Sequence, residues 1–189
     1  MKFKLNKNGF TLLEVIVALA VTVLVFLLIV GLYNLSQNAY QRTDTKAELT
    51  QNGRVILDRL VRELRQTQDV VTPLPPDASN PDTLPNEIEF QDGHNVSDIR
   101  YIRYFLNGTN ITKQIIVYYF PDQPNYYVNK GDTDQSGSPS TSQILEDYVI
   151  GEYVSDIEFW GDSTINIKLY LTKNGQTEII QTVIYGRNL

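Results

Sequence analysis

Residues 10 to 32 read FTLLEVIVALAVTVLVFLLIVGL, and this stretch decides the class of the protein. A helix of this length can cross a hydrocarbon core of about 30 Å. Glu14 is its one charged residue. A carboxylate in a membrane helix costs on the order of 2.5–3.5 kcal/mol, so such a residue usually has a partner or a function.

The residues before this stretch are basic. Lys2, Lys4 and Lys7 lie within residues 1–9, which contain no acid. Positive charge is retained on the cytoplasmic side of a membrane helix. We therefore predict a single pass through the cytoplasmic membrane with the N-terminus inside. An ordinary secretory signal peptide fits poorly, because its apolar core is shorter and small residues mark a cleavage site at the far end.

The sequence Gly9-Phe10-Thr11-Leu12-Leu13-Glu14, placed after a basic leader and at the start of an apolar run, resembles the cleavage and methylation signature of type IV pilin and pseudopilin precursors. The resemblance implies that prepilin peptidase removes residues 1–9 by cutting between Gly9 and Phe10, and that Phe10 is then N-methylated. It implies that Glu14 pairs with the Phe10 ammonium of a neighbouring subunit and sets the register of assembly. The alternative is a plain anchor with an accidental acid.

The same resemblance implies a set of partners. These are other pilin or pseudopilin subunits, prepilin peptidase, an inner-membrane assembly platform, and membrane lipid before assembly. The assembled filament would be extracellular or periplasmic. Residues 51–66, 104–113 and 145–159 also resemble W-type minor pilins and J-type pseudopilins, which implies a scarce subunit near the filament tip. A pseudopilin of a type II secretion or competence (DNA-uptake) machine remains an alternative.

Helical signals continue beyond the apolar stretch. Residues 33–68 contain no proline and are rich in helix formers, so we predict one helix over about 10–68. Its 10–32 part would lie in the membrane or the filament core, and its amphipathic 33–68 part would pack on a sheet. Gly31 and Gly53 are either points of bending or tolerated glycines. The residues expected to face the sheet are Ile56, Leu57, Leu60, Val61 and Leu64.

The remaining chain predicts a Pro-rich loop and a β-sheet head. Residues 69–86 contain five prolines, which disfavour helix and central strand. Residues 87–189 show runs of β-branched and aromatic residues, with hairpin signals at Asn107-Gly108 and Asn174-Gly175. A long helix followed by an antiparallel sheet is an α+β, pilin-like arrangement. The expected strands are Glu87–Gln91, Asp98–Leu106, Gln114–Phe120, Val154–Trp160, Thr164–Thr172 and Thr177–Tyr185.

Composition bears on the function classes. The formal net charge of −6 argues against binding to a nucleic-acid backbone, and the absence of cysteine removes disulfides and thiolate chemistry. His94 is the single histidine, so a zinc site or a Ser–His triad is not expected. We predict a structural subunit that is not an enzyme. A membrane-tethered enzyme and a tethered binding or adhesion domain that never polymerises are the competing classes.

The loop over residues 131–143 reads GDTDQSGSPSTSQ. Asp132, Asp134 and Ser136 follow the start of a calcium-binding loop, and Gln143 stands where such a loop carries an acid. Calcium is thus a candidate ligand of this loop, and no other cofactor is expected. The competing interpretation is a flexible polar loop.

Two further features have ordinary explanations. The glycosylation sequons at Asn95, Asn107 and Asn110 are expected to be unused. The tyrosine pairs are expected to pack on a sheet rather than to form an adhesive surface. These pairs are Tyr118-Tyr119 and Tyr126-Tyr127.

Overall fold

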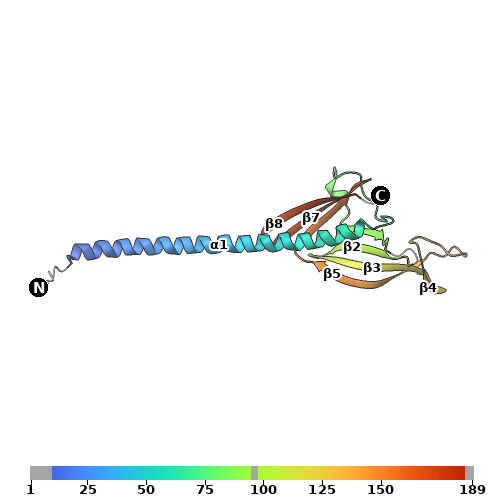
Figure 1. Ribbon diagram of the computed structural model, residues 1–189, viewed down its shortest axis with the longest axis horizontal. Helices are drawn as coiled ribbons and strands as arrows, with labels where there is room; N and C mark the ends of the chain where they lie inside the picture. Colours follow the sequence, from blue (N-terminus) through green and yellow to red (C-terminus); the bar gives the residue numbers. More distant parts are fainter. Residues whose placement is uncertain (1–9, 95–97, 186–189) are drawn as a thin grey trace, which may run out of the picture. The chain divides into compact units, whose positions relative to one another are not determined.

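The computed structural model describes residues 10–94 and 98–185, and its chain forms two compact units that divide between Asp44 and Thr45. Helix α1 (Leu12–Leu64) supplies residues to both units (Figure 1). The described chain therefore has the predicted α+β composition, a long N-terminal helix followed by antiparallel sheets. Gly9 and the rest of the leader, and Asn95 to Ser97 of the first sequon, lie outside the described residues.

The first unit is a single stretch of α1. Every described side chain up to Asp44 is exposed, including the apolar ones. Hydroxyl groups within it bond back to the helix backbone, as Thr22 Oγ1 does to the Ala18 carbonyl at 2.7 Å. By length and composition α1 qualifies as a membrane-spanning helix.

The second unit contains two antiparallel sheets. In the first sheet β3 is the central strand and pairs with β2, β4 and β5. The second sheet has the order β6-β7-β8. The strands are β1 (Glu87–Gln91), β2 (Tyr101–Asn107), β3 (Asn110–Phe120), β4 (Gln123–Val128), β5 (Thr141–Gly151), β6 (Val154–Trp160), β7 (Ile165–Lys173) and β8 (Gln176–Ile184).

Six strands match the sequence prediction within a few residues, and two were missed. β4 contains Pro124 and has mostly exposed side chains, so its sequence lacks the alternation of a half-buried strand. β5 is exposed along most of its length. The Pro-rich loop contains one short 3-10 helix, η1 (Pro81–Thr83). We had predicted a loop without helix there.

Both predicted hairpin turns are present. Asn174 and Gly175 have φ values of 51° and 74° and connect β7 to β8. Gly108, with φ of 64°, lies in the turn between β2 and β3. Positive φ is available to glycine and tolerated by asparagine, which is why these dipeptides predicted the turns correctly.

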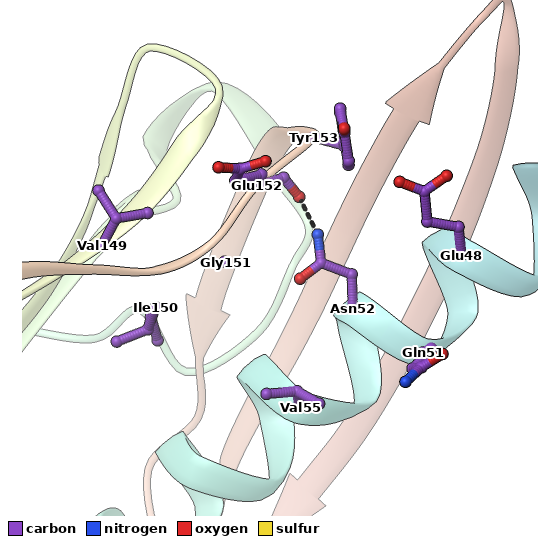
Figure 2. Close-up of a pocket in the computed structure, with 9 residues that line it drawn as sticks. All are labelled: Glu48, Gln51, Asn52, Val55, Val149, Ile150, Gly151, Glu152 and Tyr153. Carbon is purple, nitrogen blue, oxygen red and sulfur yellow. Dashed lines mark hydrogen bonds between the residues drawn. The ribbon is translucent and has the colours of Figure 1, made fainter.

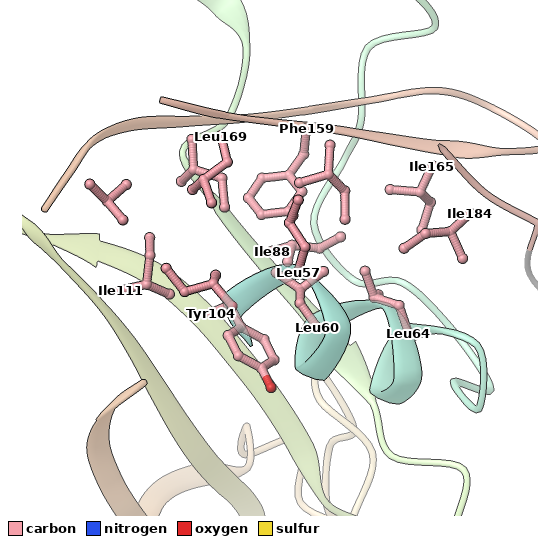
Figure 3. Packing of buried hydrophobic residues seen from close by; sticks show 14 of the residues in the cluster. Leu57, Leu60, Leu64, Ile88, Tyr104, Ile111, Phe159, Ile165, Leu169 and Ile184 are labelled. Atoms are coloured by element: carbon pink, nitrogen blue, oxygen red, sulfur yellow. The ribbon is translucent and has the colours of Figure 1, made fainter. Parts of the chain in front are cut away.

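The core of the second unit lies where α1 meets both sheets (Figure 3). Leu60 and Leu64 are fully buried there, together with Tyr104 from the first sheet and Phe159 from the second. The helical spacing therefore predicted the buried face correctly, although Val61 is only partly buried. The other fully buried members of the cluster are Leu49, Ile56, Ile88, Phe90, Ile111, Val154, Ile167, Leu169, Leu171 and Ile184.

The helix ends earlier than predicted, at Leu64 rather than about residue 68. The last turn tightens, because the Thr67 N–H bonds to the Leu64 carbonyl at 3.3 Å. The Thr67 hydroxyl then donates to the Gln91 carbonyl of β1 at 2.8 Å. This contact redirects the chain from the helix to the first strand, and it could not be read from local helix propensity.

Gly53 has a packing role that bending does not explain. A Cβ atom there would lie 2.5 Å from Ile180 Cδ1 and 3.0 Å from Leu171 Cδ1, so a larger residue would force the ends of these two side chains to shift. Gly31 has open space around it. A second close approach is at Gly151, beside Ile56. Figure 2 shows the adjacent connection, where Asn52 Nδ2 donates to the Glu152 carbonyl at 2.6 Å.

Candidate assembly site

The site that the sequence singled out begins at the N-terminus of α1, where Thr11 and Glu14 bond reciprocally. The Thr11 N–H donates to Glu14 Oε2 at 3.0 Å, and the Glu14 N–H donates to Thr11 Oγ1 at 3.3 Å. The Thr11 hydroxyl also donates to Glu14 Oε2, at 3.1 Å. This is a capping box, which satisfies N–H groups that the first helical turn leaves unpaired.

The capping box gives Thr11 a role that we did not predict. The signal was present, since threonine three residues before glutamate at the start of an apolar run is the sequence pattern of a capping box. Glu14 Oε1 accepts no hydrogen bond from the described residues. The carboxylate therefore caps its own helix through one oxygen and keeps the other available.

The apolar surface around Glu14 is not covered by any described part of the chain. Phe10 is 86% exposed and Leu13 is 72% exposed, and exposed apolar side chains continue to Tyr40. Soluble proteins rarely leave a contiguous apolar surface of this size in water. This exposed apolar surface is consistent with the length and composition of a membrane-spanning helix.

The second half of α1 carries a different kind of polar group. Glu63 accepts a hydrogen bond from Tyr104 at 2.6 Å and one from Lys113 Nζ at 2.7 Å. Lys113 is 5% exposed, so its side of this ion pair is almost inaccessible to solvent. Burial, followed by the hydrogen bond to Glu63, raises the pKa of the Tyr104 hydroxyl above its usual range. Arg59 Nε lies 3.6 Å from Glu63, one helical turn further along α1.

This cluster fastens α1 to the first sheet. Removing one member of a buried ion pair leaves the other charge without compensation, which is costly. The arrangement is structural, because its polar groups bond mainly to one another. Asp58 and Arg62, which are also four residues apart on α1, do not lie within ion-pair distance, and both side chains are exposed.

A second polar cluster holds the loop that follows β4. Glu89 accepts hydrogen bonds from Tyr118 at 3.0 Å and from Lys130 Nζ at 2.7 Å. The Lys130 N–H donates to the Tyr101 hydroxyl at 3.0 Å. Burial raises the pKa of Tyr118 and that of Tyr101. Tyr118 thus packs on the sheet as expected, whereas Tyr126 is 73% exposed.

The calcium-like loop is held by its own hydrogen bonds. Asp134 Oδ1 accepts from the Ser136 N–H, the Ser136 hydroxyl and the Ser138 N–H at 2.7–2.8 Å. These bonds, the Ser136 hydroxyl first, lower the pKa of Asp134. Asp132 Oδ2 accepts from the Asn129 N–H at 2.9 Å. The described residues contain no group of three or more His, Cys, Asp or Glu side chains that could hold a metal ion. This donor set fits calcium poorly, and calcium stays a prediction.

The remaining candidates occupy ordinary surface positions. His94 Nδ1 lies 2.5 Å from Asp92 Oδ1 in an exposed stretch. Asn107 and Asn110, which begin two sequons, flank the turn between β2 and β3. His94 and Asp92 belong to no group of three or more potential metal-binding side chains among the described residues.

Comparison with known proteins identifies the same N-terminal segment that contains Thr11 and Glu14. Residues 4–30 match a family model described as the prokaryotic N-terminal methylation motif. No curated protein matches the chain, and no solved structure does so. The resemblance to a type IV pilin-like or pseudopilin prepilin is therefore confirmed for the N-terminal segment. The described chain also has the α+β architecture that this resemblance predicts.

Proposed function

We propose that this prepilin is processed by prepilin peptidase and assembles, as a minor subunit, into a type IV pilus-like filament. The observation that carries the proposal is the fully exposed apolar stretch of α1, headed by Glu14 within a matched methylation motif. A lipid anchor alone explains the apolar residues but not a carboxylate among them. Assembly explains both features. The subunit itself catalyses no reaction in this proposal.

Glu14 is the proposed registration residue. Cleavage after Gly9 would free an ammonium group on Phe10, which is followed directly by the capping threonine. In a medium of low dielectric constant this ammonium and a neighbouring subunit's Glu14 attract strongly, and an unpaired carboxylate is penalised. Glu14 Oε1, free of hydrogen bonds from the described chain, is the acceptor proposed for that contact.

Placement near the filament tip is supported by the resemblance of residues 51–66 and 145–159 to W-type minor pilins and J-type pseudopilins. A pseudopilin of a secretion or DNA-uptake machine is the alternative within the same family. In either case the basic leader lies in the cytoplasm, and the second unit lies outside the membrane.

Intact mass spectrometry of the chain from native membranes, with and without active prepilin peptidase, tests the processing step. The expected mature chain starts at N-methylated Phe10 and appears only with the peptidase. A chain that starts at Met1 in both samples would refute the proposal and would leave a tethered head.

Substitution of Glu14 by alanine tests assembly. We expect loss of the variant from sheared filaments while its amount in the membrane is unchanged, because the substitution removes the pairing group and leaves the anchor. Thr11→Ala is the matched control, since it disrupts the same capping box without removing the charge. Equal incorporation of Glu14→Ala and the native chain would refute the registration role of Glu14, whereas absence of both chains from the filaments would favour the tethered binding domain.

A further inference from the structure

A groove between α1 and β8 carries an unbalanced positive charge. Arg54, Arg62 and Arg65 of the helix line it together with one acid, Asp58, opposite Ile180 to Thr182 of the strand, so three positive charges face one negative charge in the lining. All three arginines are exposed. No carboxylate of the described residues lies within ion-pair distance of any of them. On a chain of net charge −6 this groove, the arginine groove, is a local basic surface.

One wall of the arginine groove is a free strand edge. Within the described residues β8 pairs only with β7, so the backbone groups on its other edge have no strand partner. Ile179 and Val183 are 55% and 41% exposed on this strand. The acid of β8, Glu178, is neutralised by Lys46 at 3.1 Å. A free edge beside arginines suits an extended acidic segment, which adds as a strand and places carboxylates near the guanidinium groups.

The chain itself presents such a segment. β5 pairs only with β3 among the described residues, so its other edge also has no strand partner. It carries the exposed acids Glu146 and Asp147 and the exposed apolar residue Val149. Irregularities in the pairing with β3 fall on either side of residues 146–149. Bulges of this kind limit edge pairing, so the available stretch is short and lies at the two acids.

Charge selects one way of joining these edges. Two β8 edges brought together would oppose two arginine grooves, and two β5 edges would oppose two pairs of acids. Like charges directly opposite each other destabilise a strand pair. Only the unlike combination brings opposite charges together.

We infer that the acidic β5 edge of a second copy of this chain docks along β8 in the arginine groove. This inference deepens the proposed function by naming a contact between heads. It does not depend on cleavage after Gly9, because every residue involved lies in the second unit.

Cross-linking of the uncleaved full-length chain in detergent micelles tests the contact. The chain has no cysteine, so single cysteines report one position each. Gln181→Cys marks β8 in one tagged copy, and Val149→Cys marks β5 in a copy with another tag. A bismaleimide is expected to give mixed-tag dimers in the mixture and few dimers in either copy alone. Dimers that form equally well in the separate copies would overturn the inference.

Charge reversal separates this contact from helix association in the micelle. Arg62→Glu with Arg65→Glu in the β8-marked copy is expected to lower the yield of mixed dimers by roughly tenfold at low salt. Glu146→Lys with Asp147→Lys in the other copy should do the same, and combining the two reversed copies should restore the yield. Arg42→Glu, on the exposed first half of α1, is the control. Unchanged yields in the reversed copies would overturn the inference.

The competing ligand of a basic groove is a nucleic acid. A short labelled DNA duplex, titrated into the same micelles, is expected not to bind. Binding that the arginine reversals abolish, without mixed dimers of the native chain, would assign the groove to DNA and overturn the strand contact. Because these arms use uncleaved protein, their failure and a failure of the processing test are separate results.

Discussion

The two halves of α1 differ in whether the rest of the chain covers their apolar side chains. Up to Asp44 every described side chain of the helix is exposed, and residues 12–32 are almost entirely apolar, whereas from Leu49 to Leu64 the helix is amphipathic and buries one face against two sheets. The second half therefore finds its apolar partners within its own chain. The first half has none, so its stability depends on lipid or on other helices. α1 thus combines a second half that is buried within its own chain with a first half whose apolar surface is left exposed.

The strongest test of this contrast is Leu60→Ala compared with Leu24→Ala in the full chain. Leu60 is fully buried, so its truncation should destabilise the head by about 2–5 kcal/mol. Leu24 is 61% exposed, and its truncation should leave the stability of the head unchanged. Trp160, the one tryptophan, reports urea unfolding by fluorescence. Equal losses in the two variants would mean that the halves do not differ as described.

Tyr104→Phe sharpens the contrast by testing the buried charge that ties the second half of α1 to the first sheet. Loss of the hydrogen bond to Glu63 should cost about 1.5–3 kcal/mol. The raised pKa of Tyr104 also determines the direction in which the stability of the head changes with pH. The folded chain holds this proton more tightly, so the stabilisation is complete below the unfolded pKa of about 10 and is lost as the pH rises above it.

Urea unfolding from pH 8 to pH 11 measures both effects of Tyr104→Phe. The native chain should lose stability at alkaline pH more steeply than the variant. Tyr126→Phe is the matched control, because Tyr126 is exposed and its hydroxyl should contribute nothing measurable. Parallel alkaline profiles for the native chain and Tyr104→Phe would contradict the assignment.

Gly53→Ala and Gly31→Ala compare one glycine from each half. At Gly53 the added Cβ meets Ile180 and Leu171, and we expect a loss of about 1–3 kcal/mol in the urea unfolding of the head. At Gly31 the added methyl group meets nothing, and helix propensity favours alanine by about 1 kcal/mol. A stable Gly53→Ala head would show that α1 can move away from the second sheet at little cost.

The smallest effect is expected at Asp134, in a loop that belongs to neither half. Its pKa is lowered chiefly by the Ser136 hydroxyl, so the carboxylate stabilises the loop above the unfolded pKa of about 3.9 and stops doing so as the pH falls through the folded value. A carbon-detected NMR titration should give a midpoint below the usual one, which Ser136→Ala should raise. The same spectra with millimolar calcium test the calcium prediction, which shifts at Asp132 and Asp134 would support.

Much of this fold could be predicted because its signals are local. The apolar run, the helical spacing of Leu57, Leu60 and Leu64, and the two Asn-Gly turns each depend on residues within a few positions of one another. β4 and β5 were missed because their side chains are mostly exposed and leave no alternating pattern. β5 is a strand because it pairs with β3, and that pairing is decided by residues distant in the sequence.

The sequence by itself determined the membrane-compatible helix, the methylation motif around Glu14 and the α+β class, since periodicity and a contiguous motif carry that information. Tertiary structure alone decided why Gly53 is glycine, which partners Glu63 finds, and that three arginines border a free strand edge. Each of these facts is a juxtaposition of residues far apart in the chain. Such contacts follow from how helix and sheets pack, and no short stretch of sequence specifies them.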